Sequence, residues 1–332
     1  MKLSSLAIPT LLLSSLVGCV AADAGADDES STQDELQVAQ RDWREALAAQ
    51  PSTGAGCFTA SFPSPEWHAV ACQEAPKRPF ASPRAQTSAH LAAAAAGTFS
   101  VGNGADYALH VTGKITSSTG SFPSVTGVTS EKDGTVSNGY SIQLNSNFMT
   151  GTAACRGVSG CLSWAQFVYS SEERAVFIQN WLIGIGRCPD SSWINAGGGD
   201  CFKNSAAVSA PTIAITSLAN LKMTGAATST TDSLTFANGG TAFRTSEADS
   251  VTGLSTAWHE VEFNVIGDGG GSAATFNRGS SIRVQITAAS GSTAAPTCIA
   301  NDGTTGETNN LNLGPCTTAG GTTPNVQFTE SN

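Results

Sequence analysis

The chain has 332 residues, with 26 acidic and 16 basic side chains and a formal net charge of −10 at pH 7. This charge makes nucleic acid and anionic membrane surfaces poor partners. Only 13% of the residues are charged, and Gly, Ser, Thr and Ala are abundant, a composition typical of exported β proteins with many turns.

The N-terminus predicts export. Lys2 precedes a short apolar stretch that ends at Val17, and residues 1–18 therefore form a signal peptide, too short to span a membrane. The next residues complete LVGC, which resembles the bacterial lipobox, with Cys19 as the lipidated first residue of the mature protein. A plain signal peptide cleaved near Ala22 is the alternative. Val20, rather than Asp, follows the cysteine. In Gram-negative bacteria this resembles the signal for sorting to the outer membrane rather than for retention in the inner membrane. We expect an outer-membrane or cell-surface lipoprotein of a bacterium, attached to the membrane through its lipid anchor only.

The other eight cysteines form a disulfide framework. An even number of cysteines in an exported chain predicts disulfides, although eight allow 105 pairings. Their spacing favours four local pairs: Cys57–Cys72, Cys155–Cys161, Cys188–Cys201 and Cys298–Cys316. The chain has no CxxC pair and only four scattered histidines, so we expect neither a metal nor another cofactor. The oxygen-rich residues 301–309 read as a stapled surface loop, with a calcium site as the alternative.

The composition divides the chain into a tether, an N-terminal segment and one large domain. Residues 19–31 are small and acidic, which indicates a flexible tether. Thr32 and Glu35 form a capping-box pattern that opens a short helix, and Pro51 ends it. Residues 32–97 comprise this helix, a disulfide-stapled extension and a linker, and they are either a structural extension or a pro-region. Residues 98–332 form the main domain.

The main domain is predicted to be all-β. Strand-like runs with alternating apolar residues are separated by Gly, Ser and Asn turns. The predicted strands are 106–114, 139–149, 163–170, 174–185, 212–224, 233–237, 257–266, 273–277, 281–288 and 325–329. These strands favour one double-sheet β-sandwich or jelly roll over two domains.

The strand at 174–185 is apolar on both faces and nevertheless contains two neighbouring amides. Alternation places Ala175, Phe177, Gln179, Trp181 and Ile183 on one face, and Asn180 on the other. This pattern predicts a central strand. A hairpin through residues 170–173 would bring Trp164 or Gln166 to the Gln179 side. Buried amides need hydrogen-bond partners, so Gln179 is a candidate functional residue.

A second strand, within TAWHEVEFNVIGDGGG, carries two carboxylates. Alternation places Trp258, Glu260, Glu262, Asn264 and Ile266 on one face. An ordinary solvated strand face is the alternative. The GDGGG that follows reads as a hairpin turn, because a phosphate loop needs a strand-to-helix context and usually a lysine.

These strands carry a resemblance. Trp164, Gln179 in AVFIQNW and the later VEFNVI resemble the glutamic peptidases (eqolisins), over roughly residues 160–290. The resemblance implies a secreted acid endopeptidase with a concanavalin-like sandwich, in which a Gln and a Glu activate a water against the scissile carbonyl. The family's catalytic Glu corresponds to Ile266 here. Either Glu262 or Glu260 therefore has that role, or the face is not a peptidase site. The segments CFTASFPSPEWHAVAC, GETNNL and FTESN also resemble an uncharacterised family of exported bacterial lipoproteins.

Two functions follow as hypotheses. The first is an acid endopeptidase with an altered catalytic site, with Glu262 or Glu260 as base, Gln179 as oxyanion donor, and Trp164, Trp181 and Trp258 around the substrate. The second is a non-catalytic surface module that binds a glycan or a protein through the same residues. In both, the partner is an extracellular polypeptide or glycan.

Overall fold

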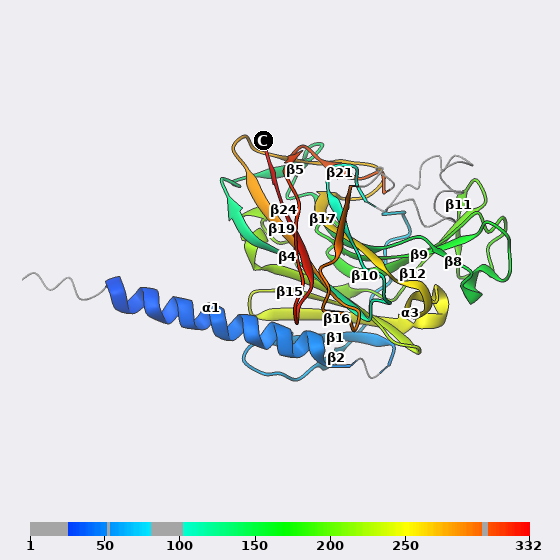
Figure 1. Ribbon diagram of the computed structural model, residues 1–332, viewed down its shortest axis with the longest axis horizontal. Coiled ribbons are helices and arrows are strands. Elements are labelled where there is room, and N and C mark those ends of the chain that lie inside the picture. The colour runs from blue at the N-terminus through cyan, green and yellow to red at the C-terminus, as the bar shows by residue number, and fades with distance from the viewer. Residues whose placement is uncertain (1–25, 52–53, 81–101, 301–304) are drawn as a thin grey trace, which may run out of the picture. The chain divides into compact units, whose positions relative to one another are not determined.

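The computed structural model describes residues 26–51, 54–80, 102–300 and 305–332. The signal peptide, Cys19 and the linker at 81–97 lie outside these residues, as does most of the tether. The chain forms two compact units, Met1–Ala39 and Gln40–Asn332, and every strand belongs to the second (Figure 1).

The fold is a sandwich of two large antiparallel sheets, as the alternating strands predict. The first sheet has the order β2-β1-β16-β15-β14-β4-β19-β24-β22, with β23 also paired to β24. Its strands are β1 (Gly56–Ser61), β2 (His68–Val70), β4 (Ser117–Thr126), β14 (Leu221–Ala227), β15 (Thr231–Asn238), β16 (Thr241–Ala248), β19 (Ser281–Ala289), β22 (Asn312–Leu313), β23 (Thr317–Ala319) and β24 (Asn325–Ser331).

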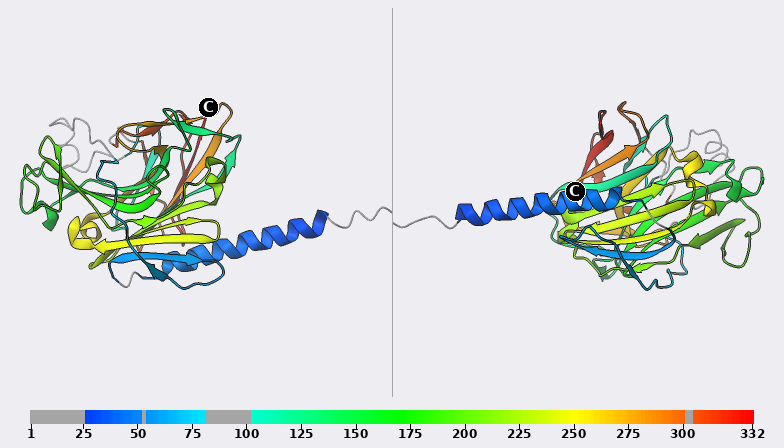
Figure 2. Two further views of the ribbon diagram at one scale, coloured as in Figure 1. Left: turned by 180° about the vertical axis from the view of Figure 1, so that it is seen from behind. Right: turned by 90° about the horizontal axis from the view of Figure 1, so that it is seen from below.

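The second sheet has the order β11-β12-β10-β9-β7-β17-β3-β20, with β8 paired to β9 and β13 to β10. Its strands are β3 (Tyr107–His110), β7 (Tyr140–Ser146), β8 (Met149–Thr150), β9 (Leu162–Ser170), β10 (Ala175–Ile183), β11 (Ile194–Gly197), β12 (Asp200–Asn204), β13 (Val208–Ser209), β17 (Glu260–Gly267) and β20 (Thr297–Ala300). Figure 2 shows the two layers from behind and from below.

Shorter elements complete the second unit. A small sheet of order β21-β18-β5-β6 contains β5 (Glu131–Asp133), β6 (Val136–Ser137), β18 (Ala273–Phe276) and β21 (Thr308–Asn309). The short helices are η1 (Ala153–Cys155), η2 (Ile215–Asn220), η3 (Asp249–Val251) and α3 (Leu254–Ala257).

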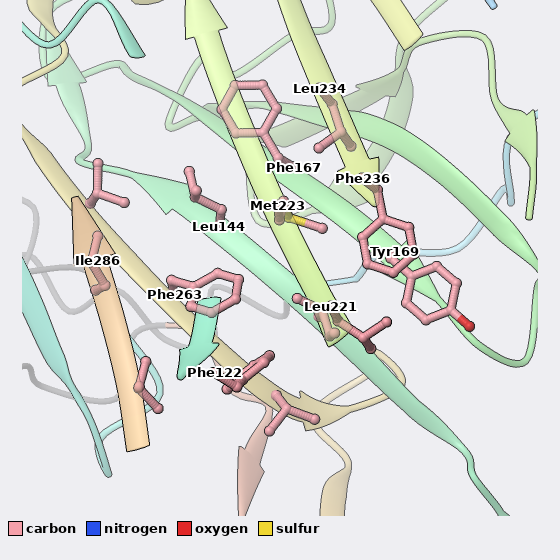
Figure 3. Packing of buried hydrophobic residues seen from close by; sticks show 14 of the residues in the cluster. Phe122, Leu144, Phe167, Tyr169, Leu221, Met223, Leu234, Phe236, Phe263 and Ile286 are labelled. Atoms are coloured by element: carbon pink, nitrogen blue, oxygen red, sulfur yellow. The ribbon is translucent and has the colours of Figure 1, made fainter. Parts of the chain in front are cut away.

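The core lies between the large sheets and is lined by alternate residues of their facing strands (Figure 3). Tyr169 of β9 stacks on Phe236 of β15, with ring centroids 4.3 Å apart. Phe263 of β17 contacts Phe122 of β4, with centroids 5.0 Å apart. Because these aromatic residues face inward, the neighbours of opposite parity on the second sheet face outward.

A glycine in the first sheet makes room for one of these rings. A Cβ atom at Gly120 would lie 2.1 Å from the ring of Phe263. We therefore expect Gly120→Ala to overpack the core and to lower the free energy of unfolding by about 3 kcal/mol, measured by urea denaturation. Combining it with Phe263→Leu should recover part of that loss in a double-mutant cycle. Strictly additive losses would contradict the contact.

The N-terminal segment differs from expectation at its start and at its place in the fold. Helix α1 spans Ala26–Ala49, so it begins six residues before Thr32 and includes part of the expected tether. No proline or glycine interrupts the sequence from Ala26 to Ala49. The stapled extension contributes β1, which pairs with β16 from Gly56↔Ser246 to Ser61↔Thr241. The extension is therefore hydrogen-bonded into the first sheet.

The four predicted disulfides are confirmed: Cys57–Cys72, Cys155–Cys161, Cys188–Cys201 and Cys298–Cys316. Such bonds indicate an extracellular or otherwise oxidising environment. Across the described residues, no helix combines the length and apolar character needed to cross a bilayer.

The strand predicted at 212–224 is wrong over its first part. Residues Ile215–Asn220 form η2, and β14 begins at Leu221. Tyr140 and Tyr169 donate their hydroxyls to the backbone carbonyls of Ile213 and Pro211. This stretch is therefore a loop held by two tyrosines, with Ile213, Ile215 and Leu218 buried.

Candidate functional site

A row of polar side chains crosses the outer face of the second sheet. The hairpin β9–β10 forms through residues 171–174, and its register sets Gln179 opposite Gln166. Gln166 lies opposite Asn145 of β7, and Asn145 lies opposite Glu262 of β17. All four side chains are fully buried. We call Gln179, Gln166, Asn145 and Glu262, together with Gln143 of β7, the polar row.

The predicted pair Gln179 and Glu262 is on one face but not in contact. Strands β9 and β7 separate them, which puts their backbones about 14 Å apart at about 4.8 Å per strand. They are therefore too distant to act on one carbonyl group. The amide bound to Glu262 is that of Asn145, which donates to Glu262 Oε2 at 2.5 Å and to the Gln143 side-chain oxygen at 3.4 Å. Gln143 is therefore linked to Glu262 through Asn145.

The carboxyl end of the row is a pair. Asp106 lies beside Glu262 within hydrogen-bonding reach, and Glu330 is close to both. Burial raises the pKa of Glu262 well above its usual range, and the negative charge of Asp106 raises it further. Burial also raises the pKa of Glu330, to about 8. A protonated carboxyl beside a second carboxyl can share its proton, as in two-carboxyl catalytic sites.

Hydrogen bonds orient the amides of the row. Trp181 Nε1 donates to Gln166 Oε1 at 2.8 Å, and Gln166 Nε2 donates to Gln143 Oε1 at 3.0 Å. This leaves the Gln143 Nε2 group to donate outward, to Ser141 Oγ and to a backbone carbonyl described next. The indole of Trp181 thus fixes which way the amides point.

Residues 73–80, which we call the strap, lie across this face. At its start, the strap forms a backbone bridge between Gln73 and Ala207, the residue before β13. Asn204 of β12 donates to the Pro76 carbonyl at 2.6 Å. Gln179 donates to the Arg78 carbonyl at 3.2 Å and accepts from the Phe80 N–H at 2.7 Å.

The last of the main-chain contacts of the strap involves Gln143, whose side chain donates to the Phe80 carbonyl at 3.1 Å. The strap therefore crosses from β12 over β10 towards β7 and the carboxyl pair. Each of these hydrogen bonds joins a side-chain amide of the sheet to a main-chain atom of the strap.

Two strap side chains are also held. The Phe80 ring is fully buried in a cluster with Val168, Ala175, Phe177 and Ala207, and meets the Phe177 ring edge-on at 5.1 Å. We call these four residues the aromatic cluster.

The other anchored side chain is that of Arg78. Arg78 Nε donates to Glu173 at 2.7 Å, and the guanidinium also contacts the carbonyl and carboxyl of Asp268.

The predicted GDGGG turn takes part in this contact. A Cβ atom at Gly269, where φ is +89°, would lie 2.6 Å from the Arg78 guanidinium. Ser170 Oγ and the Glu172 N–H donate to the Asp268 carboxyl. Burial raises the pKa of Asp268 to about 7, although these hydrogen bonds and Arg78 act to lower it. The turn therefore fits closely around the strap arginine.

The three predicted tryptophans do not form an open stacking surface. Trp164 and Trp181 lie on the outer face as expected, but they are fully buried with Phe148 and Phe202. Trp258 is not on that face: it belongs to the core between the sheets, where it contacts Phe167. The reason is local, because β17 begins at Glu260 and the strand alternation does not extend back to Trp258.

Glu260 and Ile266 lie at the margins of the outer face. Glu260 is buried, and its carboxyl is 3.7 Å from His110 Nδ1. Ile266 is buried opposite Ser141 and thus supplies no carboxyl there. Asn180 points to the core side and donates to Glu247 of β16 at 2.6 Å, so the two neighbouring amides of β10 have separate roles.

The two residues that β7 contributes to the row were not identified from the sequence. Gln143 and Asn145 alternate with Ile142 and Leu144 in SIQLNS, and this parity was the available signal. No such signal identified Asp106, Asn204 or Glu330, because each comes to the face from a different part of the chain. In the oxygen-rich loop, Glu307 accepts from the Gly271 N–H and Asn309 donates to Glu330, and no metal-ligating cluster occurs within the described ranges.

No protein-family model matches the chain, and no curated protein matches it significantly.

Proposed function

We propose that this protein is an exported acid endopeptidase that acts on the outer face of the second sheet and resembles the glutamic peptidases in its use of Gln and Glu side chains. The observation that carries the proposal is the strap: an extended segment of polypeptide held by side-chain amides beside a buried carboxyl pair. The disulfides and the signal-peptide pattern support export, and LVGC supports a lipid anchor at Cys19.

The proposed roles follow from position. Glu262 and Asp106 share one proton: the unprotonated carboxyl of the pair takes a proton from the water that attacks the carbonyl carbon, and the protonated one gives its proton to the departing amine as the C–N bond breaks. Gln143 donates to the carbonyl oxygen as negative charge develops there. Gln179 and Asn204 hold the main chain further from the reaction. This assigns the oxyanion role to Gln143 instead of Gln179, because Gln143 donates to the Phe80 carbonyl and is linked to Glu262 through Asn145.

An acid optimum is consistent with these groups. Side-chain amides remain neutral donors at any pH, whereas a Lys or Arg in their place would stabilise the ionised Glu262. The raised pKa of Glu262 keeps one proton on the carboxyl pair in acid, and this proton is the one that the departing amine needs. The strap must leave the face before another polypeptide can enter.

The test is cleavage of casein at about pH 4 in the presence of pepstatin, by the wild-type chain and by Phe80→Ala, which removes a strap anchor. We expect cleavage, faster with Phe80→Ala. In that background Gln143→Ala should lower kcat by about 10²-fold or more, while Gln179→Ala should mainly raise KM. The matched control is Gln285→Ala, a glutamine of β19 in the other sheet, which should cleave normally. No cleavage by any folded variant would refute the proposal.

The second candidate is a non-catalytic module that binds polypeptide by the same contacts. It is favoured by the main-chain character of the hydrogen bonds to the strap. Glycan binding has less support, since Trp164, Trp181 and Trp258 expose no ring face. Peptide binding without cleavage would select this second candidate.

A further inference from the structure

We infer that the strap is a built-in ligand, and that the surface beneath it is a site for extended polypeptides carrying a basic residue two positions before an aromatic one. This inference deepens the proposed function by naming the class of polypeptide, and it rests on that function only where the polypeptide is called a substrate. The binding itself is argued from the strap contacts.

The contacts divide into a general and a specific set. Asn204, Gln179 and Gln143 bind main-chain atoms at Pro76, Arg78 and Phe80, and such contacts are available to any extended peptide. Gln179 both donates to the strap and accepts from it, which fixes the direction of the bound chain. The general set therefore selects backbone conformation and polarity, as in other modes of extended-peptide recognition.

The specific set reads two side chains. The aromatic cluster of Val168, Ala175, Phe177 and Ala207 encloses the Phe80 ring completely. Glu173 and Asp268 face the Arg78 guanidinium, which also stacks over the Phe80 ring at 4.3 Å. By contrast, the side chain of Lys77 is 72% exposed and pairs with Glu74 of the strap itself. Recognition is therefore concentrated at the Arg78 and Phe80 positions.

The strap differs from an ordinary structural element in how it is bound. Apart from the bridge at Gln73, it pairs with no strand in the described part of the chain, and Pro76 and Pro79 keep it extended. Its removal would uncover amides and carboxyls that hydrogen-bond to main-chain groups. A surface built only for packing has no need of three amides positioned to bind backbone.

The test measures binding alone. The probe is a fluorescein-labelled synthetic heptapeptide of residues 74–80, EAPKRPF, followed by anisotropy with the full-length chain at neutral pH. We expect Phe80→Ala to bind the probe at least 10-fold more tightly than the wild-type chain, because the strap no longer fills the aromatic cluster. Arg78→Glu, which reverses the charge facing Glu173 and Asp268, should open the site in the same way without leaving a cavity.

Controls fix the interpretation. Phe62→Ala alters a phenylalanine that packs edge-on against Trp43 of α1 and makes none of the strap contacts described above, so it should bind the probe no better than wild type. A probe with Ala in place of its Phe should bind the opened variants at least 10-fold more weakly. For the wild-type chain, millimolar unlabelled peptide should speed hydrogen exchange at residues 76–80 by competing with the strap, a readout that needs no folded variant.

The outcomes separate this inference from the proposed function. Equal probe binding by wild type and both variants, or by none of them with no change in exchange, overturns the inference. Probe binding without casein cleavage leaves the inference standing and removes the peptidase. Casein cleavage without a preference for Arg and Phe at these positions leaves the peptidase standing and overturns the inference.

Discussion

The protein should melt at a markedly lower temperature at pH 8 than at pH 4.5. Burial raises the pKa of Asp232 to about 9, those of Glu131, Glu307 and Glu330 to about 8, and those of Glu247 and Asp268 to about 7. In the folded state these carboxyls keep their protons at a pH where the unfolded chain has released them.

The direction follows from proton linkage. Between about pH 4.5 and pH 8 the folded state binds more protons than the unfolded state, so the free energy of unfolding falls as pH rises. The stabilisation is fully present below the unfolded pKa values and is lost through the folded ones. Since one pKa unit corresponds to about 1.4 kcal/mol, we expect a total loss on the order of 5 kcal/mol or more, and a Tm lower by on the order of 10–20 °C.

The measurement is a thermal melt followed by circular dichroism across this pH range. Asp232→Asn, which mimics the protonated carboxyl, should flatten the dependence above about pH 5. The control Asp42→Asn changes an exposed carboxyl and should leave the curve unchanged. A Tm that holds steady or rises towards pH 8 would show that these carboxyls ionise within the fold at little cost.

Replacing Glu262 by Gln should remove hydrolysis while leaving peptide binding intact. An amide has the shape of a protonated carboxyl but cannot take a proton from water, so in the Phe80→Ala background kcat should fall by about 10²–10⁴-fold. Anisotropy with the 74–80 peptide should be unchanged, because Glu262 makes none of the strap contacts described above. Activity is measured as peptide release from casein at about pH 4.

The matched control is Glu247→Gln. Glu247 is also a buried glutamate with a raised pKa, of about 7, but it faces Asn180 on the core side of β10. It should retain near-normal kcat. Loss of activity in both variants to the same extent would assign the effect to stability rather than to proton transfer.

Local pattern explains much of what could be predicted here. Strict alternation in 175–183 placed Gln179 and Asn180 on opposite faces, and cysteine spacing identified all four disulfide pairs. The rule failed at Trp258, where the strand had not yet begun. It also missed β4 and β16, whose Ser, Thr and Gly residues lack an apolar alternation strong enough to mark a strand.

The site itself depends on register and on long-range contacts. That Gln166, Asn145 and Glu262 share one row follows from how four strands are aligned, and a shift by one residue would have turned one of them to the core. The strap depends on contacts between residues about 60 to 130 positions apart. No local pattern in QEAPKRPF predicts that this segment binds the side-chain amides of the second sheet.

The pairing of β1 with β16 and the bond Cys57–Cys72 give the strap a particular kinetic character. The strap begins directly after Cys72, which is bonded to Cys57 of β1, and β1 pairs with β16 of the first sheet. Its N-terminal end is therefore fixed to the first sheet. In the intact chain the strap is therefore a ligand tethered to the protein that binds it. Closure of the site is then a first-order event, independent of protein concentration, and dilution alone would not activate the protein.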